Sequence, residues 1–201
     1  MLSDSPLFGI RNADNTNGMT VTDNTLQNFK HEATTSLLGG IYNTAGNLTC
    51  TANTLHDITT NSGNASFFMI NHQPAAAATG DISNNNIYNI SLTSTSSLPK
   101  FFGISCNSAS AITCNDNTIG NAVDNNMSFA NNFGVQPIYH SLGGTLTCNN
   151  NTIQEFNLTS TGANAFFEGI VNVSGAGTIN ATGNTIKNID CASSYANLAM
   201  I

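Results

Sequence analysis

Eleven Asp and Glu side chains are the groups in this sequence best suited to catalysis. Glycoside hydrolysis, for example, needs two carboxyl groups about 5–10 Å apart, one acting as an acid and the other as a base or nucleophile. The linear sequence does not pair them, so such a site would depend on how the fold stacks distant segments. The carboxylates are Asp4, Asp14, Asp23, Glu32, Asp57, Asp81, Asp116, Asp124, Glu155, Glu168 and Asp190.

The basic, imidazole and thiol side chains form no recognisable catalytic or metal-binding motif. No His-x-x-x-His pair, Gly-x-Ser-x-Gly turn, phosphate-binding loop or Cys-x-x-Cys pair occurs. We therefore expect lone surface charges, no cofactor and no metal ion. The residues concerned are Arg11, Lys30, Lys100 and Lys187, His31, His56, His72 and His140, and Cys50, Cys106, Cys114, Cys148 and Cys191.

A repeat that occurs six times could position these residues. Its most regular copy is 145–156, and successive central Asn residues are 29, 32, 32, 34 and 33 residues apart. A period near 32 predicts one quasi-linear solenoid over residues 1–201 rather than several globular domains. The central residues are Asn24, Asn53, Asn85, Asn117, Asn151 and Asn184.

Each repeat contains three apolar segments that predict short strands. Before the central Asn, Leu146 and Cys148 alternate with Thr147 and Asn149, which indicates a strand with one buried face. A further apolar segment follows a polar connector of about ten residues, at 37–41, 67–70, 101–104, 133–135 and 166–170. The inward position five residues after the central Asn holds Phe29, Ile58, Ile90, Ala122, Phe156 and Ile189.

These strands predict an all-β fold, a right-handed parallel β-helix of about six coils of roughly 32 residues, with three strands per coil. Each coil would rise about 4.8 Å, so equivalent residues would lie above one another. The central Asn amides could then bond along the stack, each bond contributing about 1 kcal/mol. A second polar column is expected to form a similar ladder, with Asn28, Asp57, Asn89, Asn121, Glu155 and Asn188.

Stacking also tests the catalytic possibility. Asp23 shares a column with Asp116, and Asp57 shares one with Glu155, but each pair lies three coils apart. That separation is about 14 Å, too far for glycoside hydrolysis. The basic residues and the histidines are expected at unmatched positions, so we predict that the chain is not an enzyme.

Three cysteines, Cys50, Cys114 and Cys148, occupy the compact inward position three residues before the central Asn. Buried free thiols that behave as small hydrophobic groups are the simplest interpretation. Because Cys114 and Cys148 fall on successive coils, a disulfide between them is left open.

The outward residues around these inward positions form a two-column polar stripe. Such a stripe could order water as ice-binding solenoids do, contact sugars or contact another rod, although Thr is also simply favoured on exposed strands. Asp81, Ser83, Asn115, Asn149 and Asn180 interrupt the Thr pattern. The candidate binding residues are Thr20, Thr22, Thr49, Thr51, Thr113, Thr147 and Thr182.

Composition excludes some partners. Charged residues are 7% of the chain and the net charge is -7, so no basic surface could neutralise nucleic-acid phosphates. No apolar run of about 18 residues predicts a membrane span, and the first residues do not resemble a signal peptide. Residues 7–12 and 198–201 match one phase of the repeat, so we expect either a segment of a longer array or a stackable subunit.

The Asn-Asn-x-Ile-x-Asn-Ile pattern at 84–90, with its relatives in the other copies, resembles the parallel β-helix repeat of pectate-lyase-like proteins. The longer Asn/Thr/Ser-rich unit ending in Gly-Ile resembles arrays in large secreted surface proteins of Bacteroidota-type bacteria. The resemblance covers nearly the whole chain and implies the fold. It does not select a function, because such proteins include lyases, hydrolases, phage tailspikes and adhesins.

We therefore expect a non-catalytic structural or adhesive protein, extracellular or on a bacterial cell surface, such as a stalk, adhesin or fibre component. Its expected partners are further copies stacked end to end or neighbouring repeats of a longer chain, with carbohydrate as a candidate ligand. The alternatives are a polysaccharide lyase or hydrolase, with acidic or basic groups converging within about 10 Å, and an ice-binding face.

Overall fold

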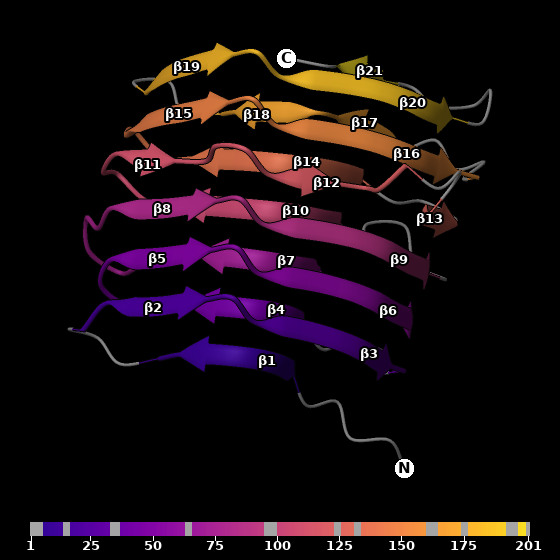
Figure 1. Cartoon of the computed structure of the whole chain (residues 1–201), viewed down its shortest axis with the longest axis horizontal. Coiled ribbons are helices and arrows are strands. Elements are labelled where there is room, and N and C mark those ends of the chain that lie inside the picture. Colours follow the sequence, from indigo (N-terminus) through magenta and orange to yellow (C-terminus); the bar gives the residue numbers. More distant parts are fainter. Residues whose placement is uncertain are drawn as a thin grey trace.

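The computed structural model describes residues 6–13, 17–32, 37–62, 66–94, 100–122, 126–130, 134–159, 165–173, 177–191 and 197–199. The described residues contain strands and no helix. They therefore include no long apolar helix of the kind that crosses a membrane. The strands form three parallel sheets stacked as a β-solenoid (Figure 1), which confirms the predicted fold class.

The three sheets take one strand each from successive repeats. Sheet A contains β1 (Leu7–Asn12), β4 (Leu38–Asn43), β7 (Phe67–His72), β10 (Lys100–Asn107), β14 (Gly134–Ser141), β17 (Phe166–Glu168), β18 (Ile170–Asn172) and β21 (Asn197–Ala199). Sheet B contains β2 (Met19–Thr22), β5 (Leu48–Thr51), β8 (Gly80–Ser83), β11 (Ile112–Thr113), β15 (Thr145–Asn149) and β19 (Thr178–Thr182). Sheet C contains β3 (Thr25–His31), β6 (Thr54–Ser62), β9 (Asn86–Ser94), β12 (Thr118–Ile119), β13 (Met127–Ala130), β16 (Thr152–Leu158) and β20 (Thr185–Cys191).

The chain climbs as a right-handed coil. In Figure 1 the nearer strands β2 and β3 run from left to right, the more distant β4 runs back from right to left, and the chain rises from bottom to top. Six copies of the repeat, stacked in register, make about five turns. The eight strands of sheet A form seven levels, because β17 and β18 share one, and the seven strands of sheet C form six levels, because β12 and β13 share one. Sheet B also has six levels, so sheet A has one level more than the other two.

Columns of equivalent residues fill the interior. Phenyl rings of Phe101, Phe129, Phe156 and Phe167 contact one another in turn, with centroids 4.8, 5.7 and 5.3 Å apart. An isoleucine column runs through sheet A. Its members are Ile10, Ile41, Ile70, Ile104, Ile138 and Ile170.

The fourth coil departs from the predicted columns. Ala122 was predicted to point inward, but it is exposed. The inward place is taken by Met127, which pairs with Ile90 and Phe156. The cause is an insertion of five residues, because Ile119 and Met127 pair with Ile87 and Ile90, which are only three residues apart. The predicted strand residue Phe133 lies outside the described residues.

The second predicted polar ladder is discontinuous for the same reason. Asn121 leaves its column and bonds to Asn126 instead. Elsewhere in that column, Asn89 donates to Asp57 and Asn188 donates to Glu155. The column therefore contains separate bonded pairs on both sides of the fourth coil.

The six central Asn residues form a continuous ladder. In each Asn except the last, both the side-chain Nδ2 and the backbone N–H donate to the Oδ1 of the next Asn along the stack. From Asn53 onward, Nδ2 also donates to a backbone carbonyl of the coil below, as Asn117 does to Ile82 at 2.8 Å. From Asn24 to Asn184, the five Nδ2–Oδ1 distances are 3.0, 3.0, 3.1, 3.0 and 2.9 Å.

Three thiols accept a further bond from this ladder. The amides of Asn53, Asn117 and Asn151 donate to the sulfur atoms three residues before them, with donor–sulfur distances of 3.4, 3.5 and 3.2 Å. These sulfur atoms belong to Cys50, Cys114 and Cys148, which are buried and free, as the sequence predicted.

We expect that Asn117→Ala lowers the free energy of unfolding by about 3 kcal/mol, because the buried backbone N–H of Asn85 loses its acceptor and the Asn85 Nδ2 loses one of its bonds. The control Asn24→Ala removes a half-buried amide at the end of the ladder and should cost about 1 kcal/mol. Urea unfolding followed by circular dichroism measures both. Equal losses for the two variants would contradict a buried ladder.

The native protein should expose one reactive thiol, that of half-buried Cys191, among its five. Burial raises the pKa of Cys50 to about 12 and also raises the pKa of Cys106, and it keeps the reagent away from both sulfur atoms. Burial and Asp190 raise the pKa of Cys191 too, but its sulfur is partly accessible and can react slowly. A chromogenic disulfide reagent at pH 8 should label one thiol, and all five after guanidinium is added. Cys191→Ser should abolish the native signal, and rapid labelling of further thiols would contradict the buried placement.

Candidate functional site

The predicted Thr stripe lies on the outer face of sheet B. The residues pair in register from coil to coil, so that Thr20 lies beside Thr49 and Thr22 beside Thr51. The third coil interrupts the array, since the Ser83 hydroxyl donates to the Asp81 carboxylate at 2.6 Å. Thr113, Thr147 and Thr182 continue the two columns beyond it.

The acidic groups do not converge in pairs along the predicted columns. Asp57 on β6 and Glu155 on β16 are three levels of sheet C apart, and Asp23 and Asp116 are three levels of sheet B apart. Asp4, Asp14 and Asp124 lie outside the described residues. Within the part of the chain that the structure describes, no three His, Cys, Asp or Glu side chains could hold a metal ion.

A left-handed backbone residue bends most strands of sheet C. The φ angles of these residues lie between 53° and 60°, a region that Asn and Asp tolerate better than other side chains. The bend lets residues on both sides of it, such as Leu26 and Phe29, pack against the core. The bend residues are Asn28, Asp57, Asn89, Glu155 and Asn188.

The outer face of sheet C has a depression of about 400 Å³ over the first three coils, here called the sheet C groove. A second depression of about 160 Å³ adjoins it and shares Lys30, Thr59 and Ser91 with it. The sheet C groove therefore presents amides, hydroxyls, one carboxylate and one ammonium group. Its lining residues are Asn28, Phe29, Lys30, Asp57, Thr59, Asn89 and Ser91.

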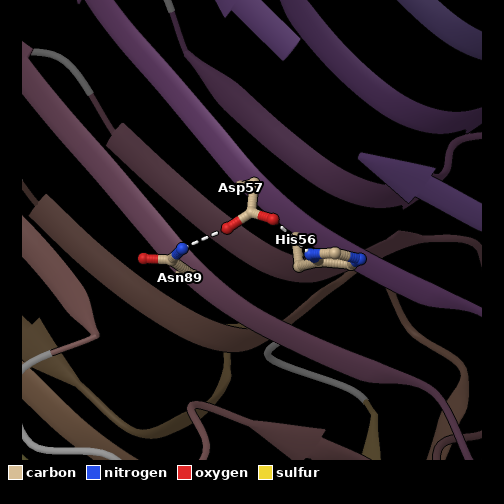
Figure 2. Close-up of polar contacts among 3 residues, drawn as sticks. All are labelled: His56, Asp57 and Asn89. Carbon is tan, nitrogen blue, oxygen red and sulfur yellow. Dashed lines mark hydrogen bonds and ion pairs between the residues drawn. The ribbon is translucent and has the colours of Figure 1, made fainter. Parts of the chain in front are cut away.

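Asp57 is held on both sides within the sheet C groove (Figure 2). His56 Nδ1 lies 2.7 Å from one carboxylate oxygen, and the Asn89 amide donates to the other. The His56 ring stacks on Tyr88, with centroids 4.9 Å apart and planes 6° from parallel. Both carboxylate oxygens are thus engaged by neighbours on β6 and β9.

Lys30 supplies the positive charge of the sheet C groove. Its ammonium group lies 2.7 Å from the Glu32 carboxylate, and both side chains are exposed. The hydrogen bond and the charge of Glu32 raise the pKa of Lys30, which therefore stays protonated. Asp57 and Lys30 line one depression, so a carboxylate and a basic group do meet on one face.

A scan against protein-family models and searches of curated proteins and of solved structures found no match to this chain. The structure thus supports the parallel β-solenoid itself, and function has to be argued from the geometry of its surfaces.

The predicted unmatched placement of the histidines is wrong for two of the four. His72 and His140 lie in one inward column of sheet A, on either side of Cys106. Strand register reveals this column, whereas the unequal spacing of the repeats hides it in the sequence. Its members are Asn12, Asn43, His72, Cys106, His140 and Asn172.

His72 is fully buried as the neutral imidazole. The Asn43 amide donates to Nδ1 at 3.0 Å, and Nε2 lies 3.4 Å from the Ala78 carbonyl, which places the proton on Nε2. Burial lowers the pKa of His72, because a charged ring would lose its hydration.

The pKa of His72 makes stability depend on pH. Above the ordinary pKa of 6.5 the contribution of the neutral ring is complete, and it is lost as the pH falls from 6.5 towards the lower folded pKa, since the unfolded chain binds the proton more tightly. His72→Asn, which substitutes a residue found elsewhere in this column, should flatten this part of the curve. Urea unfolding between pH 5 and 8 measures the difference, and parallel curves would contradict it.

Proposed function

We propose that this chain is a non-catalytic structural and adhesive β-solenoid of the bacterial cell surface or extracellular space. The observation that carries the proposal is the uninterrupted stack, in which three parallel sheets and one buried Asn ladder join every coil to the next. Such a stack is a stiff rod, because each coil is bonded to its neighbours along the whole axis. Because only 7% of the residues in the chain are charged, its surface favours contacts through hydrogen bonds rather than through charge.

The hydrogen bonds of the ladder all point the same way along the rod, from each Asn to the next, so the two ends of the rod offer different groups to a further coil. Within the described residues, no donor reaches Oδ1 of Asn24, and the Nδ2 of Asn184 has only the Cys148 carbonyl as a partner. A further coil would donate to Asn24 or accept from Asn184. A neighbouring repeat of a longer chain does so without rearrangement, whereas an end-to-end copy must displace β1 or β21, because sheet A has one extra level.

For adhesion we propose that the sheet C groove binds a polyhydroxyl ligand, namely a carbohydrate chain. The amides of Asn28 and Asn89 and the hydroxyls of Thr59 and Ser91 supply donors and acceptors over three successive coils. This arrangement extends along the rod axis, as a polymeric ligand requires.

Thr59→Ala combined with Ser91→Ala should weaken glycan binding about tenfold or more, because two hydrogen bonds of about 1 kcal/mol each are lost. Beads carrying the protein would be tested for retention on surfaces coated with different polysaccharides. Ser128→Ala is the matched control, since Ser128 follows Ser91 in the same column but does not line the groove. Absence of retention on every polysaccharide would contradict the adhesive role.

The shared depression of Asp57 and Lys30 favours polysaccharide lyase or hydrolase activity as the second candidate function. The same polysaccharides, incubated with the protein, should yield no new reducing ends or unsaturated products if the chain only binds them. Products that disappear with Asp57→Asn would establish the catalytic alternative instead. No observation favours an ice-binding face, because Asp81 and Ser83 interrupt the Thr stripe.

A further inference from the structure

Five aromatic rings form a continuous ridge on the outer face of sheet A. Each ring contacts the next, with centroids 4.9, 6.2, 4.8 and 5.1 Å apart. Four of the rings are half-buried and one, Phe102, is 7% exposed. The ridge consists of Phe8, Tyr42, Phe68, Phe102 and Tyr139.

The ridge has one ring per coil, although no single column provides all of them. Where the first outward column has Gly39, the second has Tyr42 on the same strand. A side chain at Gly39 would approach the Phe8 ring to 2.8 Å, so the glycine leaves room for the stack. Likewise Tyr139 supplies the ring where the first column has Gln136. The ridge therefore stays one ring wide and unbroken over five coils.

Opposite charges, those of Arg11 and Glu168, flank the two ends of the ridge, and the ammonium group of Lys100 lies beside it, 6.0 Å from the centroid of the Phe166 ring. The Arg11 guanidinium lies over the Phe8 ring, 4.8 Å from its centroid, at the first coil. Glu168 follows Gln136 at the other end, and the Gln136 amide donates to one of its oxygens at 2.6 Å. Within the described residues, neither Arg11 nor Glu168 has an oppositely charged partner.

We propose that this ridge binds the same ridge of a second copy of the chain, with the two rods antiparallel. A two-fold axis along the strand direction, passing between Phe68 and Phe102, places β1 of each copy opposite β17 of the other. Each Arg11 then faces the other copy's Glu168, and Phe68 and Phe102 meet at the centre. Aromatic residues at the centre and charges at the rim are the usual anatomy of a protein interface.

The antiparallel arrangement follows from the charges. Parallel rods would place Arg11 against Arg11 and Glu168 against Glu168, which costs free energy at both ends. Antiparallel rods form two opposite-charge pairs instead. The order of charges along the rod therefore selects one of the two ways in which the ridges could meet.

The size of the face predicts a weak dimer. Five steps of about 4.8 Å and strands about 20 Å long give roughly 500 Å² per copy, or about 1,000 Å² in total. That is the lower limit of specific interfaces, so we expect dissociation constants of roughly 10–1,000 µM. The ridge runs parallel to the rod axis, so this dimer leaves both ends and the sheet C groove free. It does not depend on the function proposed above.

The dimer is tested by sedimentation equilibrium of the whole chain and of variants in which the charges of Arg11 and Glu168 are reversed. The unmodified protein should associate to two copies and stop there, whereas end-to-end assembly would continue to longer oligomers. Arg11→Glu and Glu168→Arg should each weaken the dimer about tenfold, because each places like charges at both ends. The double variant should restore it. Lys187→Glu, on the outer face of sheet C, is the control and should leave the dimer unchanged.

Four results would overturn the proposal: a protein that stays monomeric up to about 1 mM, single variants that dimerise as well as the unmodified chain, single variants that dimerise more tightly, or a double variant that stays weak. Circular dichroism would check that the variants are folded. Tyr139→Thr offers an independent measurement on the ridge itself, since it removes an outer ring and keeps a residue that strands favour. It should also weaken the dimer.

Discussion

The buried amide at each coil boundary is the contact on which this structure depends. A side-chain amide has one acceptor oxygen and one two-proton donor, and in the middle of the ladder all of them are used. In Asn117 the oxygen accepts two N–H groups of Asn85, and the nitrogen donates both to the coil above and to the coil below. Asp cannot donate and Gln is longer, which explains why six repeats of otherwise divergent sequence all keep Asn there.

The inward columns are constrained by stacking, whereas the outward columns are much less so. An inward residue contacts its equivalents above and below, so Ile follows Ile throughout sheet A. An outward residue needs only a strand backbone behind it. The three faces of the rod have therefore acquired different chemistry: hydroxyls on sheet B, a groove of amides and hydroxyls on sheet C, and aromatic rings on sheet A.

This difference also explains how much could be predicted from the sequence. The ladder, the three strands per coil and the buried thiols were predictable, because stacking imposes the same residue type at the same phase. It was not predictable that Met127, rather than Ala122, points inward in the fourth coil, because the insertion shifts the strand register without changing the residue pattern on either side of it. The ridge alternates between two columns, so no column repeats a ring. A useful signal existed in Phe67-Phe68 and Phe101-Phe102, because adjacent strand residues must point to opposite faces.

Our proposal that the sheet C groove binds rather than catalyses rests on the bonds that its charged groups already make. A general acid or base has to exchange a proton with its substrate, so an oxygen must be within reach of the reacting atom. Asp57 uses one oxygen for His56 and the other for Asn89, and Lys30 is paired with Glu32. A substrate would compete with these bonds for the carboxylate and the ammonium group. The hydroxyls of Thr59 and Ser91 are not part of these bonds, and they lie in register on successive coils, as the repeating units of a polymer require.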